Sequence, residues 1–105
     1  MKILVTGANG FIGQALLQKL NSMNGLTVIG SVRRAIRLTD VGIPLTIVGD
    51  LSAQTDWSTA LSGVQTIIHT AAYGSHIKGA HRDLLAKFRC VNVEGTLNLA
   101  RQAVA

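Results

Sequence analysis

Three glycines spaced three residues apart are the positions of this sequence whose possible chemistry is clearest. They belong to the segment TGANGFIG (residues 6–13), which follows a predicted strand and opens a predicted helix. Such a loop can hold a pyrophosphate, because Gly7 allows a sharp turn, Gly10 leaves the backbone open to the anion, and Gly13 lets the helix pack closely on the sheet. Free N–H groups at the helix start, with the helix dipole behind them, would bind the negative charge. An ordinary glycine-rich turn is the alternative, but the strand-to-helix context favours nucleotide binding.

Arginine stands where a site selective for NAD usually has an acidic residue. That residue lies about 20 positions after the glycine loop, at the end of the second strand, and accepts the ribose 2′-OH. Twenty positions after Gly13 this sequence has Arg33, followed by Arg34, and its first acidic residue is Asp40. A guanidinium pairs with a 2′-phosphate in a bidentate fork. The position therefore predicts NADP as the preferred cofactor over NAD, whereas two solvated loop arginines are the alternative.

Strands and helices must position these groups, and the chain reads as an alternation of the two. The predicted strands, which are short apolar runs bounded by turn residues, are 2–6, 26–32, 44–48 and 64–69. The predicted helices, which have apolar residues at helical spacing, are 11–20 and 83–104. Segment 33–41 is ambiguous and compatible with a short helix, and 56–61 is compatible with a helical turn.

This alternation predicts an α/β fold. Continuous apolar strands separated by helices indicate a parallel sheet covered on both faces. Right-handed crossovers then give a Rossmann-like doubly wound parallel sheet with strand order 3-2-1-4. Residues 1–105 would form one incomplete dinucleotide-binding domain, the first half of the fold plus the fourth strand. The long helix has Leu84, Phe88, Val91, Gly95 and Leu99 on one apolar face. It also carries a second apolar stripe and would be buried on more than one side. That stripe comprises Val93, Leu97, Ala100 and Val104.

Composition excludes several other classes of protein. The hydrophobic share of 48% and the charged share of 14% exclude intrinsic disorder. Cys90 is the only cysteine, so no intramolecular disulfide is possible, and no apolar run is long enough for a membrane span or a signal peptide. We therefore expect a cytoplasmic protein with no membrane partner. The net charge of +5 raises nucleic acid as a partner, but the aromatics do not interleave with the basic residues, so we expect no nucleic-acid binding.

The glycine spacing G-x-x-G-x-x-G resembles that of the extended short-chain dehydrogenase/reductase family, which includes sugar-nucleotide epimerases and dehydratases. Three further segments are similar to motifs of that family: GDL at 49–51, HTAA at 69–72 and NVEGT at 92–96. The resemblance covers essentially the whole chain. Within the family, segment 88–103 is most similar to bacterial sugar-nucleotide epimerases and 4-keto-reductases of polysaccharide biosynthesis.

The resemblance implies a dinucleotide site, with Asp50 near the adenine and HTAA along the cofactor. The expected cofactor-binding residues are Gly7, Asn9, Gly10, Phe11, Ile12, Gly13, Arg33, Asp50, Leu51, His69, Ala71, Ala72 and Asn92. Simpler alternatives remain open for several of them: Asp50 could cap a turn, His69 could end its strand without a ligand, and Asn92 could bond to a neighbouring backbone. No metal site is expected.

Catalysis in this family needs a Tyr-x-x-x-Lys pair together with a Ser or Thr. The only tyrosine is Tyr73, and Ile77 stands four residues later, with Lys78 one position late. We therefore assign no catalytic residue and expect an N-terminal fragment, inactive alone, of an enzyme acting on a nucleotide sugar. A non-catalytic NADP(H)-sensing module and a basic nucleic-acid-binding protein are the rival functions. We also expect self-association or a homodimer, because strand 64–69 and the second apolar stripe would lie uncovered.

Overall fold

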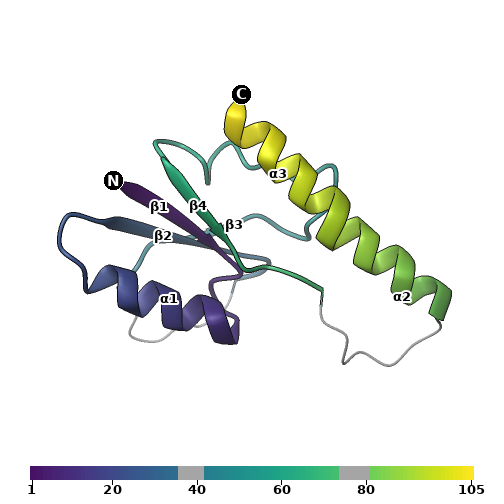
Figure 1. The fold of residues 1–105 in the computed structure, drawn as a ribbon, viewed down its shortest axis with the longest axis horizontal. Helices are drawn as coiled ribbons and strands as arrows, with labels where there is room; N and C mark the ends of the chain where they lie inside the picture. The colour runs from purple at the N-terminus through teal and green to yellow at the C-terminus, as the bar shows by residue number, and fades with distance from the viewer. Residues whose placement is uncertain (36–41, 74–80) are drawn as a thin grey trace.

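The computed structural model describes residues 1–35, 42–73 and 81–105 (Figure 1). Its elements, in chain order, are β1 (Lys2–Thr6), α1 (Phe11–Asn21), β2 (Thr27–Val32), β3 (Leu45–Ile47), β4 (Thr66–His69), α2 (His81–Phe88), the π-helical turn η1 (Arg89–Glu94) and α3 (Gly95–Val104). The four predicted strands are all present, and those after the first are slightly shorter than predicted. Most of the ambiguous segment 33–41 lies outside the described residues, at 36–41.

The four strands form one parallel sheet in the order β3-β2-β1-β4, which confirms the predicted topology. β1 lies inside the sheet, where Leu4 is paired with Ile29 of β2 on one side and with Ile67 of β4 on the other. Because all strands run in the same direction, their carboxyl ends meet at one edge of the sheet. The glycine loop starts at that edge, directly after Thr6.

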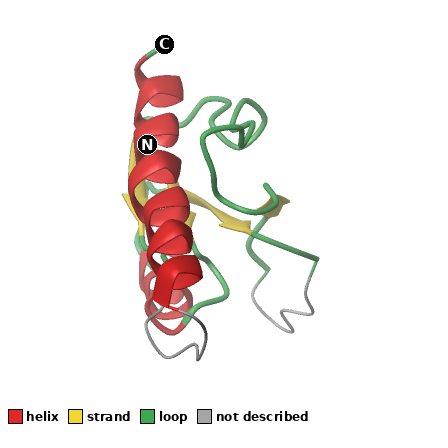
Figure 2. Cartoon of the chain, turned by 90° about the vertical axis from the view of Figure 1, so that its right-hand side faces the viewer, coloured by secondary structure: helices red, strands yellow, loops and turns green. Residues whose placement is uncertain are grey.

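Strand alternation divides the apolar core into two layers on opposite faces of the sheet. Ile3 and Val5 pack with Leu17 of α1. Leu4, which points the other way, packs with Trp57 and with Leu99 of α3. Seen from the side in Figure 2, the long helical segment lies in front of the strands. Helices therefore cover both faces, as the apolar strands predicted.

The predicted long helix is present but contains a π-helical turn that its apolar spacing did not indicate. In η1 the backbone N–H of Gly95 donates to the carbonyl of Cys90, five residues back. Gly95 lies close to the loop that follows β3: a Cβ at this position would be 3.3 Å from Leu51 Cβ and 3.4 Å from Ser52 N. The helix therefore lies close to the loop at Gly95, where the π turn is followed by α3.

One face of the long helix is buried and the other is not. Val91 and Leu99 belong to the core, as predicted. The second stripe is open to solvent, with Val93 53%, Leu97 47% and Val104 86% exposed. The expectation of a helix buried on more than one side is therefore wrong for the part of the chain that the structure describes. None of the described helices is long and apolar enough to cross a lipid bilayer.

Two side-chain amides of α3 hold the segment that follows β3. Asn98 Nδ2 donates to the carbonyls of Ser52 and Thr55, at 3.0 and 2.8 Å. Gln102 Nε2 donates to the same Thr55 carbonyl at 2.8 Å, and its oxygen accepts the Trp57 N–H at 2.8 Å. The segment contains no helix or strand, and these bonds hold its backbone in place against α3. The helical turn considered for 56–61 is a set of turns that includes one helix-type bond, from the Leu61 N–H to the Trp57 carbonyl at 2.9 Å.

Candidate functional site

A pocket of about 290 Å³ opens at the carboxyl ends of β1, β2 and β4. Ligands of open α/β sheets bind at this edge, near the point where the strand order reverses, which here lies between β1 and β4. The predicted site residues that line it are Gly7, Asn9, Gly10, Arg33, Asp50, Leu51, Ala71 and Ala72. The lining also contains Thr70, which belongs to the HTAA segment expected along the cofactor, and seven residues that were not predicted: Ser31, Val32, Val48, Gly49, Tyr73, Lys87 and Val91.

The remaining predicted residues lie next to this lining. Phe11 and Ile12 are 96% and 62% exposed, so their side chains lie mainly in solvent and their backbones open α1. Gly13 is buried beneath the loop. Asn92 bonds to Tyr73 in the wall beyond β4, and His69, at the end of β4, bonds to Thr6. The predictions for these five residues as cofactor contacts stay predictions.

The space available for a Cβ atom differs among the three glycines of the loop, and this difference indicates a separate role for each. Gly7 has φ +63°, and a Cβ there would be 2.9 Å from Ala71 Cα. A Cβ on Gly13 would be only 2.0 Å from the Gly7 carbonyl oxygen. A Cβ on Gly10 would meet only that same oxygen, at 3.3 Å. Gly7 and Gly13 are therefore required by the fold, whereas Gly10 keeps the pocket open.

Backbone donors at the start of α1 are available to an anion. Gly10 precedes the helix in an extended conformation (φ −78°, ψ 173°), and no side chain caps the helix start. The first N–H groups of a helix have no partner within it. The first turn also contains no acidic residue that would compete for these donors. With the positive end of the helix dipole, this arrangement favours a phosphate group beside Gly10.

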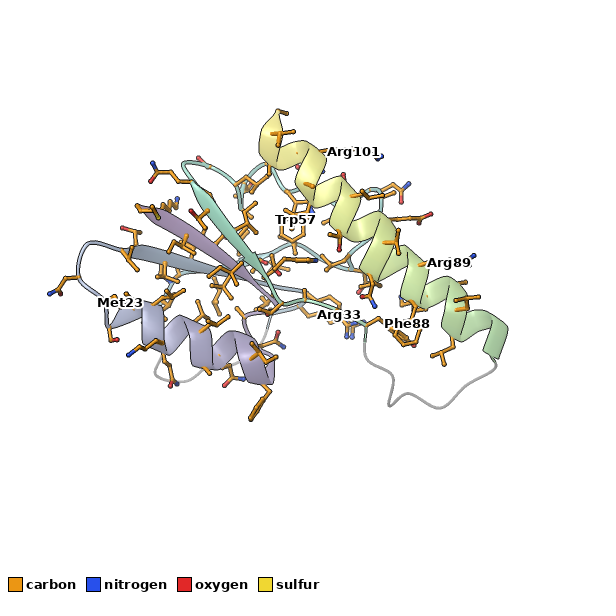
Figure 3. All side chains as sticks on the ribbon, viewed as in Figure 1. Met23, Arg33, Trp57, Phe88, Arg89 and Arg101 are labelled. Carbon is orange, nitrogen blue, oxygen red and sulfur yellow. The ribbon has the colours of Figure 1, made fainter. Side chains whose placement is uncertain are left out.

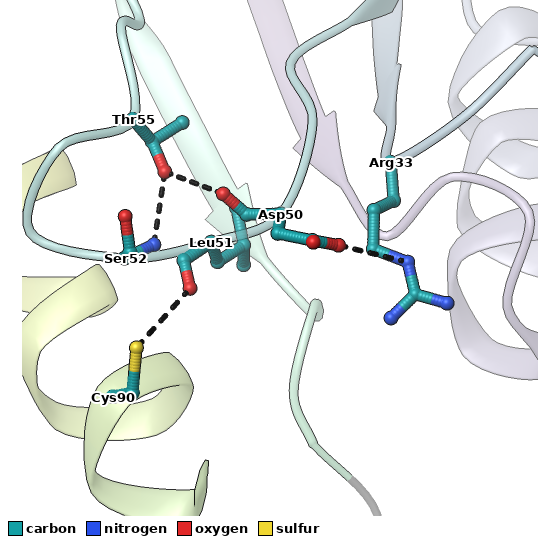
Figure 4. A network of polar contacts seen from close by, with 6 residues as sticks. All are labelled: Arg33, Asp50, Leu51, Ser52, Thr55 and Cys90. Carbon is teal, nitrogen blue, oxygen red and sulfur yellow. Dashed lines mark hydrogen bonds and ion pairs between the residues drawn. The ribbon is translucent and has the colours of Figure 1, made fainter.

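Arg33 and Asp50 meet at the side of the pocket formed by the ends of β2 and β3. Arg33 Nε lies 3.5 Å from Asp50 Oδ1, and the two side chains are 58% and 61% exposed (Figure 4). An ion pair so open to solvent is worth about 0–1 kcal/mol. Because Nε makes the contact, the two terminal amino groups of the guanidinium are turned away from Asp50. The sequence predicted a ligand for each residue and did not predict that they pair with each other.

The turn after β3 is held by its backbone and by one hydroxyl. Thr55 Oγ1 donates to the Asp50 carbonyl at 2.8 Å and accepts the Ser52 N–H at 2.9 Å (Figure 4). Gly49 enters the turn with φ +75°. The Asp50 carboxylate therefore does not cap this turn, and it remains available at the pocket beside Arg33.

Asn92 fixes the wall of the pocket beyond β4. Its Oδ1 accepts the Tyr73 N–H at 2.8 Å, and its Nδ2 donates to the Tyr73 carbonyl at 3.4 Å. The Tyr73 ring packs edge-on against Phe88, with centroids 5.2 Å apart, and Lys87 Nζ lies 5.9 Å from the Tyr73 centroid. In Figure 3, Phe88 lies on the long helical segment and Arg33 follows β2. Asn92 thus makes the backbone bonds that were its alternative role.

His69 ends β4 between two hydroxyl groups. Its Nδ1 lies 2.7 Å from Thr6 Oγ1 and its Nε2 lies 3.1 Å from Thr96 Oγ1. Burial lowers the pKa of His69 below its ordinary value of 6.5, so the imidazole is neutral at pH 7. Among the described residues, no group of three His, Cys, Asp or Glu side chains could hold a metal ion.

Lys87 is the charged lining residue that sequence reasoning missed. No ligand was predicted for it, yet it reaches the pocket from α2. Its helix begins beyond residues 74–80, and the sequence alone does not indicate how that helix turns back toward β4. A signal was present, since Phe88 beside it belongs to the predicted apolar face that turns toward the sheet.

Comparisons with known proteins agree with this geometry. The model of the NAD dependent epimerase/dehydratase family matches residues 3–105. A UDP-glucose 4-epimerase of Vibrio cholerae is 36% identical over 102 residues, which are 97% of this chain and 30% of that protein. The chain therefore spans less than a third of the length of this relative.

Solved structures show the same fold. UDP-glucuronic acid 4-epimerase from Bacillus cereus in complex with NAD superimposes with a TM-score of 0.69 at 29% identity, over 94% of this chain and 34% of that one. The yeast methylglyoxal/isovaleraldehyde reductase Gre2 complexed with NADPH has a TM-score of 0.72 at 24% identity, over 96% of this chain and 32% of that one. The second likeness concerns the fold alone.

Proposed function

Since the chain belongs to the NAD-dependent epimerase/dehydratase family, we propose that it is the dinucleotide-binding portion of an enzyme acting on a nucleotide sugar. The observation that carries the proposal is the open position at Gly10, where uncapped helix N–H groups face a pocket at the sheet edge. Relatives that are epimerases of UDP-sugars support the substrate class. The single thiol of Cys90 supports a cytoplasmic location.

The residues of the pocket fit a dinucleotide in three parts. Gly10 and the start of α1 would hold the pyrophosphate. Arg33 and Asp50 would take the adenosine end, and the wall from Ala71 to Tyr73 would take the nicotinamide end. The bound nicotinamide supplies the hydride acceptor, and this chain orients it. The acid–base pair of the reaction, Tyr-x-x-x-Lys, does not occur in these 105 residues, so we expect them to bind the cofactor without turning over a sugar.

A methyl group at Gly10 should block the dinucleotide and leave the fold intact. The added Cβ would meet only the Gly7 oxygen, at 3.3 Å, but it would project where a pyrophosphate must approach. We expect Gly10→Ala to lower affinity for NADPH and NADH at least about tenfold, which corresponds to ~1.4 kcal/mol. Calorimetric titration measures it. Gly25→Ala adds the same methyl outside the pocket, where nothing lies within 4 Å, although its φ of +84° makes the backbone strained. It should lower stability and leave the affinity of the folded chain unchanged; equal affinities in both variants would contradict the proposed site.

Arg33 should make the site prefer NADPH to NADH. A charge-assisted hydrogen bond to the 2′-phosphate contributes about 1.5–3 kcal/mol, which is roughly tenfold to a hundredfold in affinity. We expect Arg33→Ala to lose this preference by weakening NADPH binding and to leave NADH binding nearly unchanged. Arg34→Ala is the matched control, because Arg34 is exposed and is not among the residues that line the pocket. Equal affinities of the native chain for the two cofactors would argue against the assignment.

The chain should self-associate through its uncovered apolar face. β4 is an edge strand, and Val93 and Leu97 are 53% and 47% exposed on the helix. Exposed apolar surface of this kind favours association. Analytical ultracentrifugation should show species heavier than 11.1 kDa at high concentration, and a Val93→Lys, Leu97→Lys double variant should reduce them. Met23→Lys, which changes another exposed apolar residue, should not. A single monomer at all concentrations would refute this expectation.

A further inference from the structure

A chain of hydrogen bonds crosses the molecule behind the pocket wall. It runs from Thr6 at the end of β1, through His69 at the end of β4, to Thr96 in α3. The distances are 2.7 Å between Thr6 Oγ1 and His69 Nδ1, and 3.1 Å between His69 Nε2 and Thr96 Oγ1. His69 is partly buried, and it adjoins the lining residues Thr70 and Ala71. His69 is not itself among the residues that line the pocket.

The partners of Thr6 determine which nitrogen of His69 carries the proton. Thr6 Oγ1 accepts the N–H of Thr70 at 3.0 Å and the N–H of Ala71 at 3.2 Å. A hydroxyl has two acceptor lone pairs and one proton to donate. With both lone pairs in use, Thr6 must donate to Nδ1 of His69. The proton of the neutral ring then lies on Nε2, from which it can be donated to Thr96.

The same hydroxyl holds the wall against the glycine loop. Thr70 Oγ1 donates to the Thr6 carbonyl at 2.6 Å, so Thr70 makes two hydrogen bonds to Thr6 and the neighbouring Ala71 makes a third. The wall lies so near the loop that a Cβ on Gly7 would be 2.9 Å from both Ala71 Cα and Ala71 N. The spacing between these two sides of the pocket thus depends on where the Thr6 hydroxyl points.

We propose that His69 is a positioning residue, whose unprotonated Nδ1 directs the Thr6 hydroxyl so that the N–H groups of Thr70 and Ala71 are held at the glycine loop. Its effect on dinucleotide affinity rests on the function proposed above, whereas its effect on these two amides does not. No contact between His69 and the ligand is required. A histidine protonated on Nδ1 would donate to Thr6 Oγ1 and leave it only one lone pair for the two amides, so at least one of them would be released.

Nitrogen-15 NMR of the ligand-free chain at pH 7 tests the tautomer. We expect His69 to have an unprotonated Nδ1 and a protonated Nε2, and we expect slow hydrogen exchange at the amides of Thr70 and Ala71. A ring protonated on Nδ1, or fast exchange at both amides, would overturn the proposal. Thr66→Val, which removes an exposed hydroxyl on the same strand, is the control and should change neither signal.

Two substitutions at His69 separate positioning from mere packing. His69→Leu has no acceptor for the Thr6 hydroxyl, so exchange at Thr70 and Ala71 should become fast and dinucleotide affinity should fall about tenfold. The side-chain oxygen of His69→Asn can accept that proton in place of Nδ1, so it should restore slow exchange and most of the affinity. Equal behaviour of the two folded variants in amide exchange would refute the proposal.

A milder variant tests the hydrogen bonds of His69 if His69→Leu does not fold. Thr96→Val removes only the acceptor of the Nε2 proton and leaves the bond to Thr6 in place. We expect the Nε2 proton signal to shift and exchange faster, while Nδ1 stays unprotonated and the two amides stay protected. An unchanged Nε2 signal would contradict the chain of bonds. If the native chain binds neither NADPH nor NADH, the proposed function fails, and the amide exchange still tests His69.

Discussion

Replacing Gly13 with alanine should abolish dinucleotide binding and weaken the fold at the same time. The new Cβ would lie 2.0 Å from the Gly7 oxygen and 2.8 Å from the Gly7 carbonyl carbon. Both are backbone atoms, so the clash cannot be relieved by moving a flexible side chain. Relief requires α1 to move away from the sheet or the loop to change shape. Overpacking of this kind costs about 1–3 kcal/mol of stability, and occasionally more.

Urea unfolding followed by circular dichroism, together with calorimetric titration of NADPH, would measure both losses. Gly10→Ala is the matched comparison, because it adds the same atom three residues earlier and meets no contact shorter than 3.3 Å. We expect Gly10→Ala to keep native stability and lose binding, and Gly13→Ala to lose both. A Gly13→Ala chain that unfolds at the native urea concentration would show that the helix and loop adapt more easily than the structure indicates.

Trp57→Ala should remove a large part of the stability of the chain. Trp57 is 0% exposed and packs with Leu4, Ile29 and Leu51 in the second core layer. Truncating a buried tryptophan to alanine costs about 3–5 kcal/mol, whereas small domains have total stabilities of about 5–15 kcal/mol. Urea unfolding measured by circular dichroism is the appropriate experiment, since this is the only tryptophan and the variant has no indole fluorescence.

Trp57→Phe distinguishes apolar packing from the polar part of the indole. Trp57 Nε1 is buried and has no hydrogen-bond partner among the described residues. An unsatisfied buried donor costs about 1–3 kcal/mol, so its removal should offset part of the packing lost with the smaller ring. We expect Trp57→Phe to be much more stable than Trp57→Ala. Equal destabilisation by the two substitutions would show that the indole N–H is satisfied in solution.

The sheet was predictable because each strand can be identified from a short segment of the sequence. Each strand is a short apolar run, and chirality then permits few ways to connect parallel strands. The glycine loop was equally readable, since the need for Gly7 and Gly13 arises from backbone geometry at a strand-to-helix junction. Arg33 was placed at the site by its position after the second strand, and Asp50 was placed there by the resemblance of the GDL segment to a family motif. Their mutual contact was not, because it depends on how far apart β2 and β3 hold two flexible side chains.

The polar contacts between distant segments were not predictable. Asn98 and Gln102 look like ordinary exposed residues of a helix, yet both bond to the loop at 52–57. Thr6 and His69 are 63 positions apart, and only the pairing of β1 with β4 brings them together. Periodicity describes which side of an element is apolar, and it contains no information about which polar groups will meet across elements.

The π turn at Arg89–Glu94 changes how α2 is rotated about the helix axis relative to α3. A π-helical turn contains one more residue than an α-helical turn, so η1 amounts to a one-residue insertion stored inside a continuous helix. Without it, α2 would be rotated by about 100° relative to α3. Lys87 would then leave the pocket while Gly95 kept its place against Leu51. Because of the extra residue, the first half of the helix directs Lys87 to the pocket, while its second half keeps Gly95 packed against Leu51.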